Sequence, residues 1–181
     1  MTSLQPLIQW TTPFAEFYRN ALVRYANGTR SPQELLQTAE EASLLARLGI
    51  SPQNLYDYVE DGINLETVLL VFSLRRDYFW LVQEGIPSPK RIPEAEFPRK
   101  TDAFEHIPWL PRIVLKAQSF LKGELPETIM FGCRGDRDFC REHRINLAEF
   151  LHFVWLAGDD ALPKAVAWFR LRKSQSPAPQ S

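Results

Sequence analysis

The chain has 181 residues, which is enough for one domain or two small ones, and 45% of them are hydrophobic. That apolar content can form a core without metals, and two cysteines are too few for the disulfide framework of a small secreted domain. The net charge of −1 provides no overall field that favours nucleic acid or an anionic membrane. No apolar run reaches the roughly 18 residues of a membrane span, and the N-terminus lacks the basic start of a secretory signal, so we expect a cytoplasmic protein.

Four helices are predicted between residues 13 and 84, after an N-terminal arm at residues 1–12. Their starts share a Ser, Thr or Asn cap, which proline follows in three cases: Thr12, Ser31, Ser51 and Asn64. Their ends share a glycine that can adopt a left-handed backbone: Gly28, Gly49, Gly62 and Gly85. Ser31 and Glu34 have the spacing of a capping box, so the second helix is expected to begin at Ser31. Residues 13–85 are therefore predicted to form one helical unit.

Residues 86–108 differ from the helical segments because prolines are scattered through them: Pro87, Pro89, Pro93, Pro98 and Pro108. Proline removes a backbone donor and interrupts regular structure, so this stretch is predicted to be an extended connector. Apolar residues within it favour a connector that lies against the protein.

A second helical unit is predicted at residues 109–173. Its helices are expected at about 109–122, 136–144 and 146–158, with a last helix that begins after residue 158. Asn146 and Glu149 have capping-box spacing at the start of the third of these helices. The tail at residues 174–181 is small, polar and proline-bearing, so we expect it to be disordered.

The two units align with each other when the chain is shifted by 95 residues, or by 97 after Gly158. The aligned pairs share apolar or glycine character: Phe14 with Trp109, Gly28 with Gly123, Leu44 with Phe139, Leu55 with Phe150, and Phe72 with Phe169. Any two amphipathic helices can be aligned, but here one shift serves three helices. We therefore predict an all-α protein of two tandem four-helix repeats, packed as one globular helical bundle.

Five charged residues of the second unit form the main candidate binding site: Arg112, Lys116, Glu124, Asp136 and Arg137. In the first unit, apolar or uncharged residues stand at the positions of Arg112, Lys116 and Glu124. A structural interpretation is an ion pair with Asp136 or Glu124 that leaves Arg112 more buried than Lys116. A functional interpretation is a site for a carboxylate, a phosphate or an acidic partner.

Cys133, Asp136, Cys140 and His143 are residue types that zinc binds, at spacings that could place them on one helical face. However, Cys140 and His143 align with Leu45 and Leu48, so a packing role is the simpler interpretation. Cys140 with His143 or His152 is an unspecific nucleophile–base pair. We therefore predict no metal, no cofactor and no catalytic residue.

The stretch from about residue 105 to 173 resembles a bacterial family, domain-of-unknown-function family 5069. The matching residues follow that family's LPR…DKARA…G…PLDRRFL pattern: Leu110, Pro111, Arg112, Lys116, Ala117, Gly123, Asp136, Arg137 and Phe139. This chain has Leu115 where the family has Asp, and it lacks the Tyr expected after Glu124. The resemblance implies a helical, bacterial, cytoplasmic protein and supplies no activity.

These patterns favour a non-catalytic module that binds a protein partner or a small anionic ligand, as a monomer or homodimer. The alternative is an enzyme, or a protein that assists one, with an anion-binding pocket around Arg112, Lys116 and Asp136. Nucleic acid and membranes are not expected partners.

Overall fold

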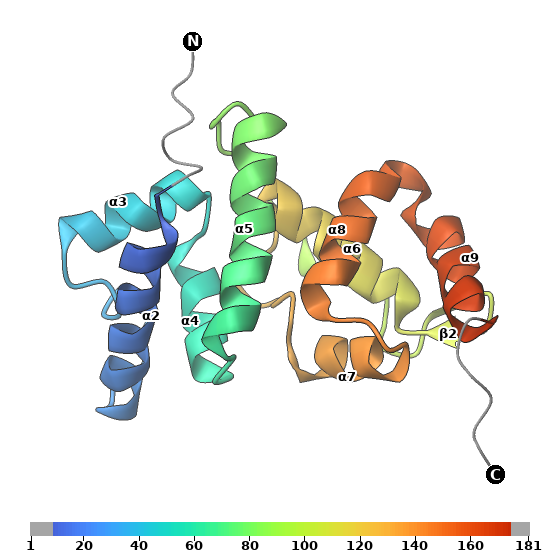
Figure 1. Ribbon diagram of the computed structural model, residues 1–181, viewed down its shortest axis with the longest axis horizontal. Helices are drawn as coiled ribbons and strands as arrows, with labels where there is room; N and C mark the ends of the chain where they lie inside the picture. The colour runs from blue at the N-terminus through green and yellow to red at the C-terminus, as the bar shows by residue number, and fades with distance from the viewer. Residues whose placement is uncertain (1–8, 175–181) are drawn as a thin grey trace.

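The structure, a computed structural model, describes residues 9–174 and is mostly helical, as predicted (Figure 1). The first part of the chain contains four helices: α2 (Thr11–Ala26), α3 (Ala39–Leu48), α4 (Pro52–Glu60) and α5 (Leu65–Leu81). The last part contains four more, with a 3₁₀ turn before the final one: α6 (Leu110–Lys122), α7 (Arg134–Glu142), α8 (Leu147–Ala157), η2 (Gly158–Asp160) and α9 (Ala161–Ser174). No helix among the described residues is both long and apolar enough to cross a membrane.

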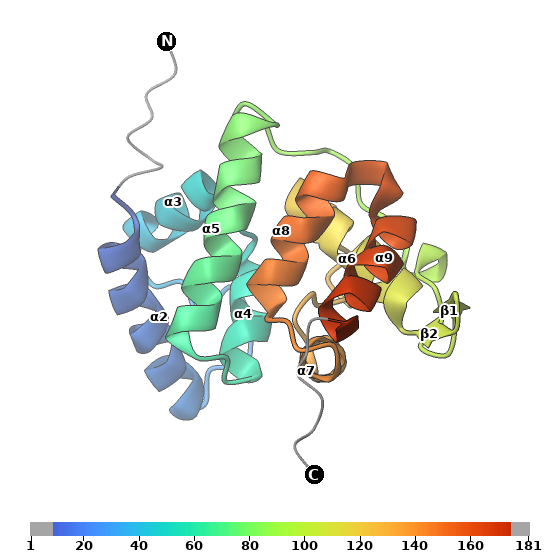
Figure 2. The ribbon, with the colours of Figure 1, turned by 45° about the vertical axis from the view of Figure 1, so that its right-hand side comes forward.

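Helix α5 lies at the centre of the molecule, with α2 to α4 on one side of it and α6 to α9 on the other (Figures 1 and 2). It contacts α2 and α3 in one direction and α6 and α8 in the other. The ring of Phe72 in α5 lies 5.4 Å from Phe14, 5.0 Å from Tyr58 and 6.3 Å from Phe120, measured between ring centroids. These aromatic contacts join the two parts of the chain in one continuous core.

Side-chain caps start three of the helices, α4, α5 and α8, where the sequence placed them. The hydroxyl of Ser51 accepts a hydrogen bond from the Asn54 amide at α4, and the Asn64 side chain does the same for the Thr67 amide at α5. At α8, Asn146 and Glu149 form the predicted capping box. Helix α2 differs, because it begins at Thr11 after Trp10 rather than at Pro13, and residues 11 and 12 belong to it rather than to the arm.

The predicted start of α3, with Ser31 as its cap, is wrong by seven residues. The helix begins at Ala39, where Thr38 and Glu41 form a complete capping box, and residues 32–35 form a separate turn. Arg24 of α2 donates to the carboxylate of Glu41 at 2.7 Å and to the Leu35 carbonyl at 2.6 Å. These bonds favour the capping box of Thr38 and Glu41, and they keep the turn at residues 32–35 separate from α3.

Residues 86–108 are less extended than predicted, because they include a 3₁₀ turn η1 (Glu94–Glu96) and a hairpin of β1 (Ala103–Phe104) with β2 (Ile107–Pro108). The strands are antiparallel and pair Ala103 with Pro108 and Phe104 with Ile107. Buried Ile92 and Phe97 hold the segment against the protein, in agreement with the expectation from its apolar residues. The predicted disordered tail falls almost entirely on residues 175–181, outside the described residues.

Candidate functional site

The start of α6 is shaped by Trp109, which has a left-handed backbone (φ 68°) and whose amide donates to the Asp102 carbonyl at 3.1 Å. This turn brings the chain from the hairpin into α6, with Pro111 in the first turn of the helix. Arg112 and Lys116 follow four residues apart, so their side chains lie on the same side of α6.

The start of α7 lacks a side-chain cap at Cys133. Asp136, in the first turn of α7, instead bonds back to the loop that precedes the helix. One oxygen of its carboxylate, Oδ2, accepts a hydrogen bond of 2.8 Å from the Gly132 amide. A carboxylate in the first turn of a helix also interacts favourably with the helix dipole. The position of Gly132 requires glycine, because its φ is +95° and a Cβ there would lie 2.8 Å from the Tyr58 hydroxyl.

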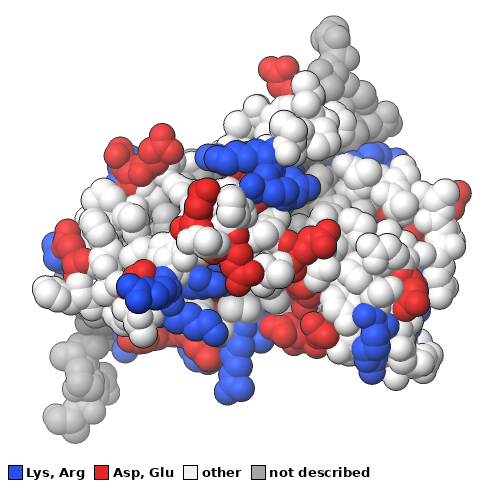
Figure 3. Space-filling view, turned by 180° about the vertical axis from the view of Figure 1, so that it is seen from behind, with Lys and Arg blue, Asp and Glu red and all other residues white. Residues whose placement is uncertain are grey.

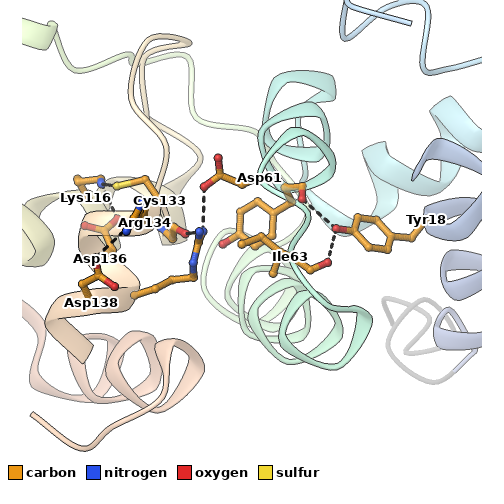
Figure 4. Close-up of polar contacts among 11 residues, drawn as sticks. Tyr18, Asp61, Ile63, Lys116, Cys133, Arg134, Asp136 and Asp138 are labelled. Carbon is orange, nitrogen blue, oxygen red and sulfur yellow. Dashed lines mark hydrogen bonds and ion pairs between the residues drawn. The ribbon is translucent and has the colours of Figure 1, made fainter. Parts of the chain in front are cut away.

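Lys116 and Asp136 form a buried ion pair, with 2% and 0% of their side chains exposed. The ammonium of Lys116 donates to Oδ2 of Asp136 and, at 3.2 Å, to the sulfur of Cys133 (Figure 4). The indole of Trp109 donates to the other oxygen, Oδ1, at 2.9 Å. The structural ion pair predicted from the sequence is therefore present for Lys116, and both carboxylate oxygens of Asp136 accept hydrogen bonds within the protein.

Arg112 does not behave as predicted. It is half-buried and less buried than Lys116, and among residues 9–172 no ion pair joins it to a carboxylate. Its guanidinium instead donates to the Pro98 carbonyl at 2.7 Å and lies 6.0 Å from the centre of the Phe97 ring. Both partners belong to the proline-rich connector at residues 86–108. Its path cannot be predicted from hydrophobic periodicity in the sequence.

The other two candidates lie at different places. Glu124 accepts a hydrogen bond of 2.8 Å from the Ser88 hydroxyl, and its carbonyl accepts the Ile92 amide, so it fastens the connector. Arg137 pairs with Asp61 at 2.9 Å and donates to the Gly132 carbonyl at 2.7 Å. Asp61 directly follows α4, so Arg137 ties the two parts of the chain together.

An open cleft of about 620 Å³ lies above the Lys116–Asp136 pair. Four cations and two carboxylates line it: Lys100, Arg112, Lys116, Arg134, Asp61 and Asp138. Asp136 neutralises Lys116, and Asp138 lies 3.7 Å from Arg134, which leaves Lys100 and Arg112 without an ion pair in the described part of the chain. Acidic and basic side chains are mixed over the face in Figure 3, so neither sign of charge dominates that face.

Tyr58, which is buried, and Asp57, which is half-buried, have raised pKa values. Burial, with the Asp136 charge adding to it, raises the pKa of the Tyr58 phenol well above its usual range. Its hydroxyl has no hydrogen-bond partner among the described residues. Burial also raises the pKa of Asp57 to about 6, while the hydrogen bond from Gln53 and the charge of Lys116 oppose the shift.

The cysteine and histidine candidates do not assemble. Cys140 is buried in the core, which raises the pKa of its thiol to about 12, and the His143 ring stacks 4.3 Å from Phe169. Within residues 9–174, no three His, Cys, Asp or Glu side chains are placed to hold a metal ion.

Sequence reasoning missed Trp109 and Cys133 as partners of the ion pair. Trp109 was aligned with apolar Phe14, and no pattern distinguishes an indole that packs from one that also donates a hydrogen bond. Comparison with family models, curated proteins and solved structures found no match to this chain.

Proposed function

We propose that the protein is a non-catalytic module that binds a small anion, such as a phosphate or a carboxylate, in the cleft at the starts of α6 and α7. The observation that supports this proposal is Arg112, a half-buried guanidinium at the cleft without a carboxylate partner. Arginine has five donors, and the Pro98 carbonyl occupies one of them. Lys100 adds positive charge at the same opening.

The buried ion pair below the cleft supports a binding role over a catalytic one. A general base needs a free lone pair that can reach the proton it removes. The carboxylate of Asp136 already accepts bonds from Lys116, Trp109 and the Gly132 amide. An enzyme that used Asp136 would first have to break this network.

Thermal unfolding in the presence of inorganic phosphate or citrate tests the proposal. Both anions should raise the melting temperature of the wild-type protein, because a ligand that binds only the folded state stabilises it. Arg112→Gln should lose that rise, while Arg19→Gln, on the exposed face of α2, should keep it. An unchanged response of Arg112→Gln would refute the cleft as the site.

We also infer that α2 to α5 and α6 to α9 are tandem repeats. Equivalent positions carry equivalent bonds: the Gln37 amide donates to Glu41 as the Gly132 amide donates to Asp136. The Ile50 amide donates to the Leu45 carbonyl at 3.0 Å, and 95 residues later the Ile145 amide donates to the Cys140 carbonyl at 3.0 Å. Membership of family 5069, a bacterial source and a cytoplasmic location stay predictions from the resemblance.

A further inference from the structure

Arg75 of α5 is a buried cation outside the cleft, with 3% of its surface exposed. Its guanidinium lies between the C-terminal ends of α3 and α6. A Cβ built on Gly49 would lie 3.0 Å from its Nη2 atom, and one built on Gly123 would lie 2.6 Å from it. The two glycines therefore leave the space that the guanidinium occupies.

The protein neutralises this charge only in part. Arg75 donates to the Gln83 side chain at 2.7 Å and lies 5.2 Å from the centre of the Phe79 ring. Among residues 9–172, no ion pair joins it to a carboxylate. Burial lowers its pKa to about 10, with Tyr78 opposing and Arg91 adding to the shift, so it remains charged at neutral pH. A buried charge without a counter-ion is unfavourable.

A cavity of about 220 Å³ opens beside Arg75. One part of its wall is apolar and includes Ile50, Phe120 and Leu125. The other part is electropositive: Arg91 lies there, donating to the Gly123 carbonyl at 2.7 Å, and so does the N-terminal turn of α4, the positive end of its dipole. Exposed Glu127 also lines the opening.

The corresponding arginine of the second half shows what this position can bind. Arg172, which aligns with Arg75, pairs with the carboxylate of Glu149 and donates to the Arg144 carbonyl. Glu149 is the third residue of α8, and Asn54 is the third residue of α4. The carboxylate that neutralises Arg172 therefore has no counterpart at Arg75, where Asn54 lines the cavity instead.

We infer that the cavity beside Arg75 binds a small aliphatic monocarboxylic acid, with its carboxylate on Arg75 and its tail against Ile50, Phe120 and Leu125. A cavity of 220 Å³ has the volume of about seven water molecules, which suits a short acid and excludes a drug-sized ligand. The site is distinct from the Arg112 cleft, since the two share no lining residue.

Thermal unfolding with butyrate tests the inference, with butyramide as the uncharged control of the same shape and with phosphate as the competing anion, both compared in Arg112→Gln so that binding in the cleft does not contribute. At about five times its dissociation constant, butyrate should raise the melting temperature by about 2–4 °C, and neither control should match it. Asn54→Glu places the carboxylate of the second half beside Arg75, so it should raise the melting temperature and abolish the butyrate response. Asn54→Gln is the matched neutral variant and should keep the response.

Arg75→Gln should also lose the butyrate response, and if this variant does not fold, the Asn54 pair still decides the matter. Arg112→Gln should keep it, which separates this site from the cleft. The inference is overturned if butyrate has no effect on the wild-type protein, if butyramide or phosphate stabilises equally, or if Asn54→Glu responds like Asn54→Gln.

Discussion

Glu41 and Asp136, which the proposed repeat aligns, are held in different ways in the first and second halves of the molecule. Glu41 begins α3 and pairs with Arg24, and the two side chains keep 13% and 16% of their surface exposed. Asp136 begins α7 and pairs with Lys116, and this pair is almost fully buried. Each carboxylate also accepts the backbone amide four residues before it. Of these two helix starts, that of α3 is therefore stabilised near solvent and that of α7 in the core.

The two halves also differ in how they neutralise a second pair of residues that the proposed repeat aligns, Arg75 and Arg172. In the second half, Arg172 has its carboxylate partner Glu149, while Lys116 and Asp136 neutralise each other below the open cleft. In the first half, Arg75 is buried without such a partner. Within residues 9–172, Arg112 and Arg75 are thus a half-buried and a buried cation without an ion pair, at two separate places, and an external anion would be favourable at each.

The largest expected effect comes from Lys116→Met, which leaves Asp136 buried and unpaired. We expect a loss of about 3–5 kcal/mol in the free energy of unfolding, because the side chain keeps its volume and loses its charge. Urea denaturation measures this loss. Lys116→Met with Asp136→Asn removes both charges and should recover part of it. A loss below about 1 kcal/mol would place the pair among exposed ones and contradict its burial.

Gly49→Ala should come next, with a loss of about 2–4 kcal/mol in unfolding free energy. Gly49 has a φ of +65°, and its new Cβ would lie 2.7 Å from Cγ of Phe79, so backbone strain and overpacking add. The exposed Gly28, whose Cβ would meet nothing within 4 Å, is the matched control for backbone strain alone. Equal losses at the two glycines, measured by thermal unfolding, would contradict the close approach of α5 at Gly49.

Much of this fold could be predicted from the sequence because caps and glycines are local signals. Asn146 with Glu149 marks α8 without knowledge of the rest of the chain. The start of α3 could not be predicted in the same way, since two capping boxes compete there. The choice between them depends on Arg24, which reaches Glu41 from another helix.

The candidate site was predictable where its partners lie on helices. The sequence offered Asp136 and Glu124 as partners of an ion pair, and in the structure Lys116 pairs with Asp136. The partners of Arg112 lie on an irregular connector without periodicity, and its burial was predicted incorrectly for that reason. Arg75 lies on the buried face of α5, where an arginine is expected only with a counter-ion. That it lacks one becomes evident only by contrast with Arg172, which pairs with Glu149.

Glu41→Gln should have a smaller effect, a loss of about 1–2 kcal/mol at neutral pH, since the pair with Arg24 is partly exposed. Burial alone would raise the pKa of Glu41, but the hydrogen bond from Arg24 and those from the Gln37 and Thr38 amides outweigh it, so the pKa is lowered. A lowered pKa adds stability above the unfolded value of about 4.3 and loses it as the pH falls through the folded value. Unfolding measured from pH 7 to 3 should therefore show the two proteins converging in acid, and a constant difference would contradict the charged pair.

The smallest expected effect is a gain, from Arg144→Gly. Arg144 follows α7 as Gly49 follows α3, and both have left-handed backbone, with φ values of 56° and 65°. A residue with a Cβ is disfavoured there by about 1 kcal/mol, while glycine is not. The bond from Arg172 goes to the carbonyl of Arg144, which glycine retains. Arg144→Gly should therefore raise the melting temperature by about 2–4 °C, given that about 1 kcal/mol has this effect in a chain of this length.

Arg144→Ala keeps the Cβ and loses the same side-chain contacts, so it separates backbone strain from those contacts. If Arg144→Gly were no more stable than Arg144→Ala, the two helix ends would not be equivalent, and the proposed repeat would lose one of its closest matches.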